Sequence, residues 1–229
     1  MNFRSQAKNK IQANEPVLAI NTFAGGFDVA DLVSKLGIDI LFIDCERAGI
    51  GIELVGPMAR AAQRHGAAAI VRSKTRHVED WVSYLDRGID GLVIPRVETA
   101  QEAQLILETI SYACGSKAKD MIIIPQIESE AGLKNIDQIP AVKGFDLFLI
   151  GPNDLSHSMG FGGDITVTEV QQALDHIALK IKEQGERFGL PVTLANAKAW
   201  QKKGAIFNFH SLEALIKPSL EALKKEITC

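Results

Sequence analysis

The stretch GLVIPRVETAQEAQLILETISYACGSKAKDMIIIPQIE, Gly91 to Glu128, contains the unit that decides the fold. Two runs rich in apolar, β-branched residues, 91–97 and 121–128, flank a helical pattern at 99–113. Thr99 and Glu102 have the spacing of a capping box, which predicts that the helix begins there. Apolar strands that alternate with helices are typical of a parallel sheet covered on both faces.

The same unit recurs along the chain. Strand cores are predicted at 17–23, 39–44, 67–73, 91–97, 121–128, 146–152, 191–196 and 205–210. Helical patterns are predicted at 53–66, 78–88, 99–113, 166–189 and 212–227, the last broken at Pro218. Eight units, with no GxGxxG after the first strand, favour a (β/α)8 TIM barrel over a dinucleotide-binding sheet. We expect a single α/β domain over 1–229, with 1–15 as an N-terminal extension.

Composition excludes several classes of function. Of the 229 residues, 46% are hydrophobic and 23% charged, and the net charge is −3, so no basic field favours nucleic acid. We expect no membrane span, because no apolar run is long enough. The start of the chain, MNFRSQAKNKIQANEP, lacks the apolar core of a signal peptide. The three cysteines (Cys45, Cys114 and Cys229) show no metal-type spacing, which favours reduced thiols in a cytoplasmic protein.

Polar residues gather where the predicted strands end, which is where TIM barrels place their active sites. In strand order they are Asn21; Asp44, Glu46 and Arg47; Arg72; Arg96; Gln126 and Glu128; Gly151, Pro152, Asn153 and Asp154; Asn196; and His210. The predicted N-terminal ends carry no comparable set of charges. The stretch FIDCERAG, residues 42–49, therefore predicts part of a catalytic floor, by which we mean the polar side chains at the C-terminal ends of the strands, at the base of the active-site cavity.

Two carboxylates stand out in this set. Glu128 and Asp154 end neighbouring strands, and such a pair suits a hard divalent cation, Mg²⁺ or Mn²⁺, completed by waters and substrate oxygens. Gln126 shares the face of Glu128 through the two-residue period of a strand. The alternative is that each acid caps the following helix, for which Asp154 is well placed.

Other candidates have two interpretations each. Arg72 at the barrel mouth could clamp a carboxylate with its planar fork, or form an ion pair with a neighbouring acid. Asp86 lies in LDRG, where the default is a solvated helix end. His157 follows GPNDLS, and we expect it on a loop surface.

The blocks IPQIESEAGLKNIDQI (124–139) and FDLFLIGPNDLSHSMGF (145–161) resemble the HpcH/HpaI aldolase and citrate lyase β-subunit family of the phosphoenolpyruvate/pyruvate-binding superfamily. FIDCERAG, AIVRSK (69–74), LDRGIDGLVIPRVETAQEA (85–103) and TLANAKAWQKKGAIFNF (193–209) follow in the same order and spacing. The resemblance spans about residues 17–225. It implies a TIM barrel assembled as a homo-oligomer, a hexamer or trimer, and a class II reaction in which a divalent metal binds pyruvate or another 2-oxo acid.

The resemblance also implies roles by matching position. Glu128 and Asp154 would hold the metal, Gln126 and the backbone of Gly151, Pro152 and Asn153 the 2-oxo acid. Arg72 would stabilise the enolate oxygen, and Asp44 and Glu46 would order metal-bound waters. An enolate held in this way adds to an aldehyde, or forms as a carbon–carbon bond breaks.

Two departures from the family pattern matter. Where the family's aldolases have Asp-Gly-Glu-His after the second strand, this chain has Asp44-Cys45-Glu46-Arg47. Arginine stays protonated, so Arg47 cannot replace the histidine that pairs with the aspartate matched by Asp86. Arg47 could pair with Asp86 or bind a second carboxylate. The family's long glycine-rich loop is also missing, since only SYACGSKAKD (111–120) precedes the fifth strand.

Three hypotheses of function follow. The first is a metal-dependent carbon–carbon lyase acting on a 2-oxo acid, an aldolase in the broad sense. The second is citrate-synthase-like or lyase-type condensation, or decarboxylation, of a dicarboxylate such as oxaloacetate. The third, of another class, is a catalytically inactive barrel that binds a metabolite or a partner, favoured by Arg47 and the missing loop.

Overall fold

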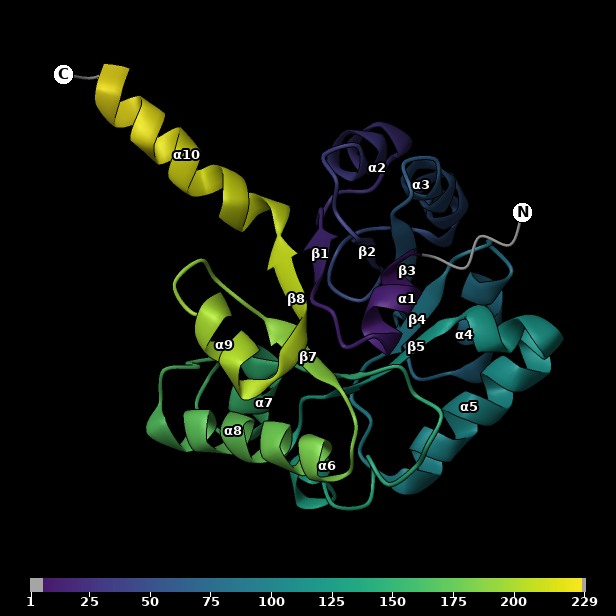
Figure 1. Cartoon of the computed structure of the whole chain (residues 1–229). Helices are drawn as coiled ribbons and strands as arrows, with labels where there is room; N and C mark the ends of the chain where they lie inside the picture. The colour runs from purple at the N-terminus through teal and green to yellow at the C-terminus, as the bar shows by residue number, and fades with distance from the viewer. Residues whose placement is uncertain (1–5, 228–229) are drawn as a thin grey trace.

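A computed structural model describes residues 6–227, which form a closed barrel of eight parallel strands in sequential order with helices outside it (Figure 1). The strands are β1 Val17–Asn21, β2 Ile40–Asp44, β3 Ala68–Arg72, β4 Gly91–Ile94, β5 Ile122–Ile127, β6 Phe148–Ile150, β7 Phe188–Pro191 and β8 Ala205–Ser211. The predicted (β/α)8 barrel is confirmed.

Ten α-helices and one 3₁₀ helix are found within residues 6–227. They are α1 Gln6–Gln12, α2 Phe27–Ser34, α3 Ile52–Gln63, α4 Val78–Leu85, α5 Ala100–Cys114, η1 Gly115–Asp120, α6 Glu130–Lys134, α7 Pro152–Ser158, α8 Thr168–Glu183, α9 Ala197–Lys203 and α10 Leu212–Ile227. The capping box at the start of α5 is confirmed, because the Thr99 side chain accepts from the Glu102 N–H and Glu102 accepts from the Thr99 N–H.

Two apolar layers hold the barrel together. One fills its interior and includes Phe42 of β2 and Ile70 of β3, while the other lies between the strands and the helices and includes Ile43 and Val71. Successive side chains of a strand therefore alternate between the interior and the helix layer. Continued by two residues, this alternation turns the last polar side chain of a strand into the barrel mouth.

Helix α1 closes the opposite end of the barrel. Its Ala7 and Ile11 belong to the interior apolar layer. Its Lys8 Nζ lies 3.1 Å from a carboxylate oxygen of Asp146, a residue that precedes β6. Lys8 also donates to the carbonyl of Met121, before β5. Most of the segment expected as an extension, 1–15, is thus part of the fold, and its first five residues lie outside the described part.

The seventh strand was predicted wrongly, at 191–196 instead of 188–191. Helix α8 ends at Glu183, and Gly185 has a φ of 75°, so the chain turns before Phe188 and not after Gly189. Gly189 lies within β7. This strand position requires glycine, because a Cβ there would be 2.3 Å from the Phe207 carbonyl oxygen of β8. Thr193 to Asn196, predicted as strand, instead forms the turn in which the Thr193 N–H donates to Asn196 Oδ1, just before α9.

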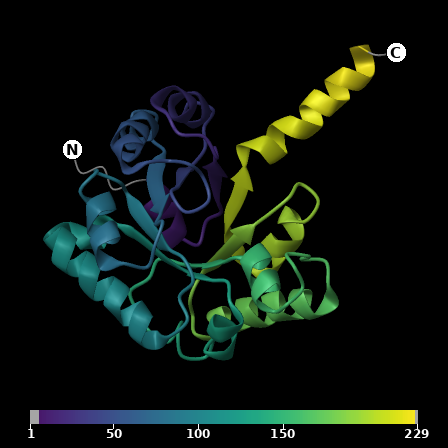
Figure 2. The same cartoon turned by 180° about the vertical axis from the view of Figure 1, so that it is seen from behind.

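The last helix was predicted to break at Pro218, but α10 runs through it. Figures 1 and 2 show α10 projecting away from the barrel, and none of its residues is buried. Leu215, Ile216, Leu220, Leu223 and Ile227 are all exposed along it. Within residues 6–227, no helix is long and apolar enough to cross a membrane.

Candidate active site

The polar ends of β1, β2, β3 and β5 meet inside the barrel mouth. Phe42 and Ile70 point into the interior, so Asp44 and Arg72, two residues further on, do so as well. The register of the sheet pairs Asp44 directly with Arg72. The strand period and the sheet register therefore bring this acid and base together.

Asp44 is the anchor of the mouth. Fully buried, it accepts from Arg72 Nε at 3.0 Å and from Arg72 Nη2 at 2.6 Å, one bond to each oxygen. It also accepts from Asn21 Nδ2 at 3.1 Å and from the backbone N–H groups of Glu46 and Arg47, each at 3.1 Å. Five accepted bonds exhaust the roughly four lone-pair sites of a carboxylate, so its contacts are already made by the protein.

Arg72 is held charged at this place. Burial alone would lower the pKa of its guanidinium, but the hydrogen bond and charge of Asp44, with the charges of Glu46 and Glu128, raise that pKa above its ordinary value. Arg72 lies 5.9 Å above the Phe42 ring, which supports the guanidinium from below. Of the two interpretations of Arg72, the ion pair to an acid is confirmed, and its side chain also lines the mouth cavity.

Gln126 and Glu128 form the second half of the floor. Gln126 Nε2 donates to Glu128 Oε2 at 2.5 Å, and the Arg96 N–H donates to Glu128 Oε1 at 2.9 Å. Arg96 has a φ of 52°, in the left-handed region that a residue of its size rarely adopts. The chain after β4 is therefore held in an unfavourable conformation that points a backbone N–H at Glu128.

Glu128 is 2% exposed and surrounded by acids. Burial, followed by the charges of Glu46 and Asp154, raises the pKa of its carboxyl to about 8. Burial likewise raises the pKa of Glu46, against the lowering effect of Arg72 and Arg47. The negative charges of Glu46 and Asp154 near Glu128 are thus only partly offset by Arg72, which pairs with Asp44 and Glu46, and by Arg47, which pairs with Asp154.

Gly151 and the helix that follows it complete the floor. A Cβ at Gly151 would lie 2.6 Å from Glu128 Oε2 and 2.8 Å from Gln126 Nε2, so only glycine lets β6 approach them. Pro152 is the first residue of α7, Asn153 lines the cavity, and Asp154 lies in the first turn. Asp154 forms an ion pair with Arg47, whose side chain is 55% exposed.

These residues surround a cavity of about 510 Å³. Its wall includes Arg47, Arg72, Gln126, Gly151, Pro152, Asn153, Asp154 and His157, with Phe23 and Phe209. His157, expected on a loop surface, is exposed but lines this cavity, since it lies three residues after Asp154 on α7. The i, i+3 spacing was the signal that could have placed it there.

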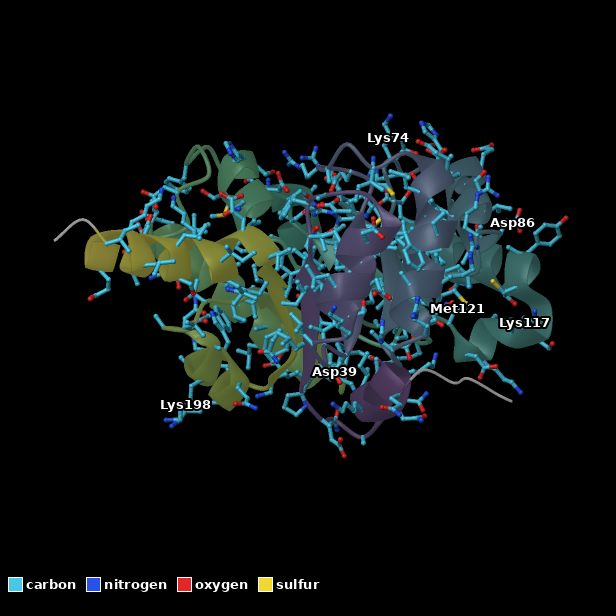
Figure 3. All side chains as sticks on the ribbon, turned by 90° about the horizontal axis from the view of Figure 1, so that it is seen from above. Asp39, Lys74, Asp86, Lys117, Met121 and Lys198 are labelled. Carbon is cyan, nitrogen blue, oxygen red and sulfur yellow. The ribbon has the colours of Figure 1, made fainter. Side chains whose placement is uncertain are left out.

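Three of the candidates lie outside the mouth. Asp86 is exposed at the C-terminal end of α4, and its charge, after burial, contributes to raising the pKa of Cys114 at the end of α5 (Figure 3). Figure 3 shows Asp86 at the outer edge of the molecule. Asn196 caps α9, and His210 lines a groove on the outer side of β8. Within one chain, Arg47 therefore pairs with Asp154 and not with Asp86.

The donor set fits a divalent cation. Within residues 6–227, no group of three His, Cys, Asp or Glu side chains is arranged to hold a metal alone. Glu128 and Asp154 can supply two oxygens, and Gln126 Oε1 and Glu46 Oε2 are buried without a hydrogen-bond partner. Hard oxygen donors with room for waters are what Mg²⁺ and Mn²⁺ require.

The comparisons with known proteins show the family and the fold of the chain. The family model described as HpcH/HpaI aldolase/citrate lyase matches residues 25–208. The chain belongs to this family. The resemblance drawn from the QIE and GPNDLS blocks is thereby confirmed.

Relatives within the HpcH/HpaI family are aldolases by name. The 4-hydroxy-2-oxo-heptane-1,7-dioate aldolase of Escherichia coli is 29% identical, over 87% of this chain and 86% of its own. The 5-keto-4-deoxy-D-glucarate aldolase of Salmonella arizonae is 29% identical, over 77% of this chain and 78% of its own. Among solved structures, Citrate Synthase SbnG has a TM-score of 0.89 at 23% identity, covering 98% of both chains, which shows the fold alone.

Proposed function

We propose that the chain is a divalent-metal-dependent carbon–carbon lyase of the class II aldolase type, which acts through the enolate of pyruvate or a related 2-oxo acid. The observation that carries the proposal is the position of Glu46, Glu128 and Asp154 beside the buried Arg72, where the charges of Glu46 and Asp154 help to raise the pKa of Glu128 to about 8. Membership of a family whose named relatives are aldolases supports it.

Each group has a part in the proposed reaction. Glu128 and Asp154 would hold Mg²⁺ or Mn²⁺, which when bound supplies the Lewis acidity that polarises a 2-oxo group. Gln126 Oε1 and Nε2 and the backbone of Gly151 to Asn153 would orient the 2-oxo acid. Arg72 would stabilise the oxygen on which negative charge develops, and its bidentate bond to Asp44 fixes the guanidinium before the reaction begins.

The structure favours different work for two acids that the resemblance treats alike. Asp44 has its lone pairs occupied by Arg72, Asn21 and two backbone N–H groups, so we assign it the positioning of Arg72. Glu46 is half-buried at the mouth, and its Oε2 accepts no hydrogen bond, although it lies 3.1 Å from Arg72 Nε. Glu46 is therefore the better candidate for ordering waters at the cation.

A second candidate function follows from Arg47. Proton transfer needs a group that can lose its proton near neutral pH, and the turn after β2 offers a guanidinium instead. Decarboxylation of a dicarboxylate such as oxaloacetate forms an enolate without any base, because the electron pair of the broken carbon–carbon bond stays with the 2-oxo fragment when carbon dioxide leaves. This route suits a site that retains the residues proposed to hold the metal and the 2-oxo acid but has Arg47 in place of the family's histidine.

We propose that the chain assembles with further copies of itself into a homo-oligomer, which by family resemblance is a trimer or a hexamer. A (β/α)8 barrel is normally closed by a helix over its last strand. Here α10 extends away, and a groove of about 610 Å³ remains beside β1 and β8, lined by Leu18, Leu194 and Leu215 among others. The exposed apolar side of α10 matches such a groove on a second copy.

The test of function is hydrogen–deuterium exchange of the pyruvate methyl group, followed by NMR with Mg²⁺ or Mn²⁺ and then with EDTA. We expect metal-dependent exchange that Glu128→Ala and Arg72→Ala each abolish, while Arg64→Ala, on the outer surface, retains it. Oxaloacetate is tested in parallel for metal-dependent release of carbon dioxide. Absence of both reactions would exclude the proposed chemistry.

A further inference from the structure

Arg47 lines the cavity with a guanidinium group, most of whose N–H donors make no hydrogen bond to another side chain within residues 6–227. Its Nη2 contacts one oxygen of Asp154, and no other side-chain hydrogen bond of its guanidinium is found within residues 6–227. A guanidinium carries five N–H donors in a planar fork that matches both oxygens of a carboxylate. Most of the binding capacity of Arg47 is therefore unused.

Arg72, the other arginine of the cavity wall, differs in this respect. It donates to both oxygens of Asp44, and its side chain is 11% exposed, whereas the Arg47 side chain is 55% exposed. The Arg47 N–H is itself fixed by Asp44 at 3.1 Å, which places the base of its side chain at the rim. The mouth thus has one buried arginine that is held by two hydrogen bonds to Asp44 and one exposed arginine that is held by a single contact with Asp154.

The ion pair of Arg47 also competes with the function of Asp154. A cation held by Asp154 takes up the negative charge that now attracts the guanidinium, and Arg47 then needs another anion. The cavity of about 510 Å³ is much larger than a three-carbon acid on the floor, so it has room for an anion at the rim.

We propose that Arg47 is a specificity-determining residue that binds a second carboxylate, so that the enzyme acts on 2-oxo acids carrying a distal anionic group. This inference rests on the function proposed above. It gives a positive role to the residue that departs from the family pattern, in place of the proton transfer that an arginine cannot perform.

The test is binding of matched 2-oxo acids in the presence of Mg²⁺, measured by isothermal titration calorimetry. The two ligands, 2-oxoglutarate and 2-oxopentanoate, have the same carbon chain and differ in the distal carboxylate. We expect wild type to bind 2-oxoglutarate at least about tenfold more tightly, the effect of a charge-assisted contact. Arg47→Gln should remove this preference and leave the affinity for 2-oxopentanoate unchanged.

Binding of the metal alone provides a second readout. Loss of a merely structural role in Arg47→Gln would not weaken the binding of 2-oxoglutarate and at the same time strengthen the binding of Mn²⁺. Titration with Mn²⁺, without any 2-oxo acid, should show tighter binding by Arg47→Gln than by wild type, since the guanidinium no longer competes for Asp154. Arg64→Gln is the matched control, because Arg64 is equally exposed and pairs with Asp31 outside the barrel mouth. That variant should behave as wild type in both titrations.

The outcomes separate this inference from the function it rests on. Equal binding of both ligands by wild type, or an equal loss of both in Arg47→Gln, would overturn the role of Arg47 and leave the proposed function standing. If neither 2-oxo acid binds with Mg²⁺ or Mn²⁺ present, the role of Arg47 is overturned, and the proposed function fails as well only if the pyruvate and oxaloacetate reactions are also absent.

Discussion

The Cα of Gly151 is packed so closely against Glu128 that a Cβ at this position would lie 2.6 Å from the Glu128 Oε2 atom. The glycine after β6 thus leaves room for the carboxylate that follows the neighbouring strand β5. The φ of Gly151 is −102°, which any residue can adopt, so the requirement for glycine is one of space and not of backbone conformation.

Gly151→Ala should therefore damage the floor more than the fold. The methyl group displaces Glu128 or Gln126, and we expect affinity for Mn²⁺ to fall at least about tenfold, as for a displaced metal ligand or its support. The measurement is calorimetric titration with Mn²⁺, with thermal unfolding in parallel. Gly49→Ala is the control, because nothing lies within 4 Å of a Cβ there. Normal binding by Gly151→Ala would show that the site tolerates the methyl group.

The raised pKa of Glu128 predicts the pH dependence of metal-free stability. A carboxyl with a pKa of about 8 when folded and 4.5 as its ordinary value favours folding when protonated. Its contribution is therefore fully present below pH 4.5 and is lost as the pH rises towards 8. Glu128→Gln lacks this loss, so in EDTA its Tm should exceed that of wild type more at pH 8 than at pH 5.5. A difference that is constant with pH would contradict the shift.

The buried pair of Asp44 and Arg72 should contribute to stability as a unit. Asp44→Asn leaves the buried Arg72 charged, without its bidentate carboxylate and with only the ion pair to Glu46, and we expect the free energy of unfolding to fall by about 3 kcal/mol. The measurement is urea unfolding of Asp44→Asn, Arg72→Gln and the double variant. The double variant should lose much less than the sum of the two, because the second change removes the stranded charge. Strict additivity would show that the pair is uncoupled.

The exposed apolar side of α10 should hold the assembly together. Leu220→Glu places a charge in its middle, so we expect a smaller particle by size-exclusion chromatography with light scattering. Ala222→Glu is the matched control, because a residue two positions away points to another side of the helix. Wild type that is monomeric at all concentrations, or assemblies unaffected by Leu220→Glu, would contradict the proposed oligomer.

The parts of the site that could be predicted from the sequence follow from the two-residue period of strands. Phe42 to Asp44, Ile70 to Arg72 and Gln126 to Glu128 are each one period, so the interior side chains predict those of the mouth. Glycine roles were harder to predict. Gly185 ends a helix and Gly189 lies in a strand, and only the approach of Phe207 from β8 distinguishes the two.

Long-range geometry explains the remaining differences. The pairing of Arg47 with Asp154 joins residues 107 apart and depends on how α7 emerges after β6, which no local pattern encodes. The exposed position of Asp86 follows from helix α4 ending at the side of the barrel opposite to the mouth. The direction of α10 is set by what it packs against, and its own periodicity predicts only that one side is apolar.

Helix α1 has a consequence for how the chain acquires its structure. The partners of Lys8 are Met121 and Asp146, which follow it by 113 and 138 residues. During synthesis, α1 emerges first, but both of these partners are available only after five of the eight strands have left the ribosome. The contacts of this early helix thus have a high sequence separation, and we expect it to dock only after the chain up to Asp146 has been made.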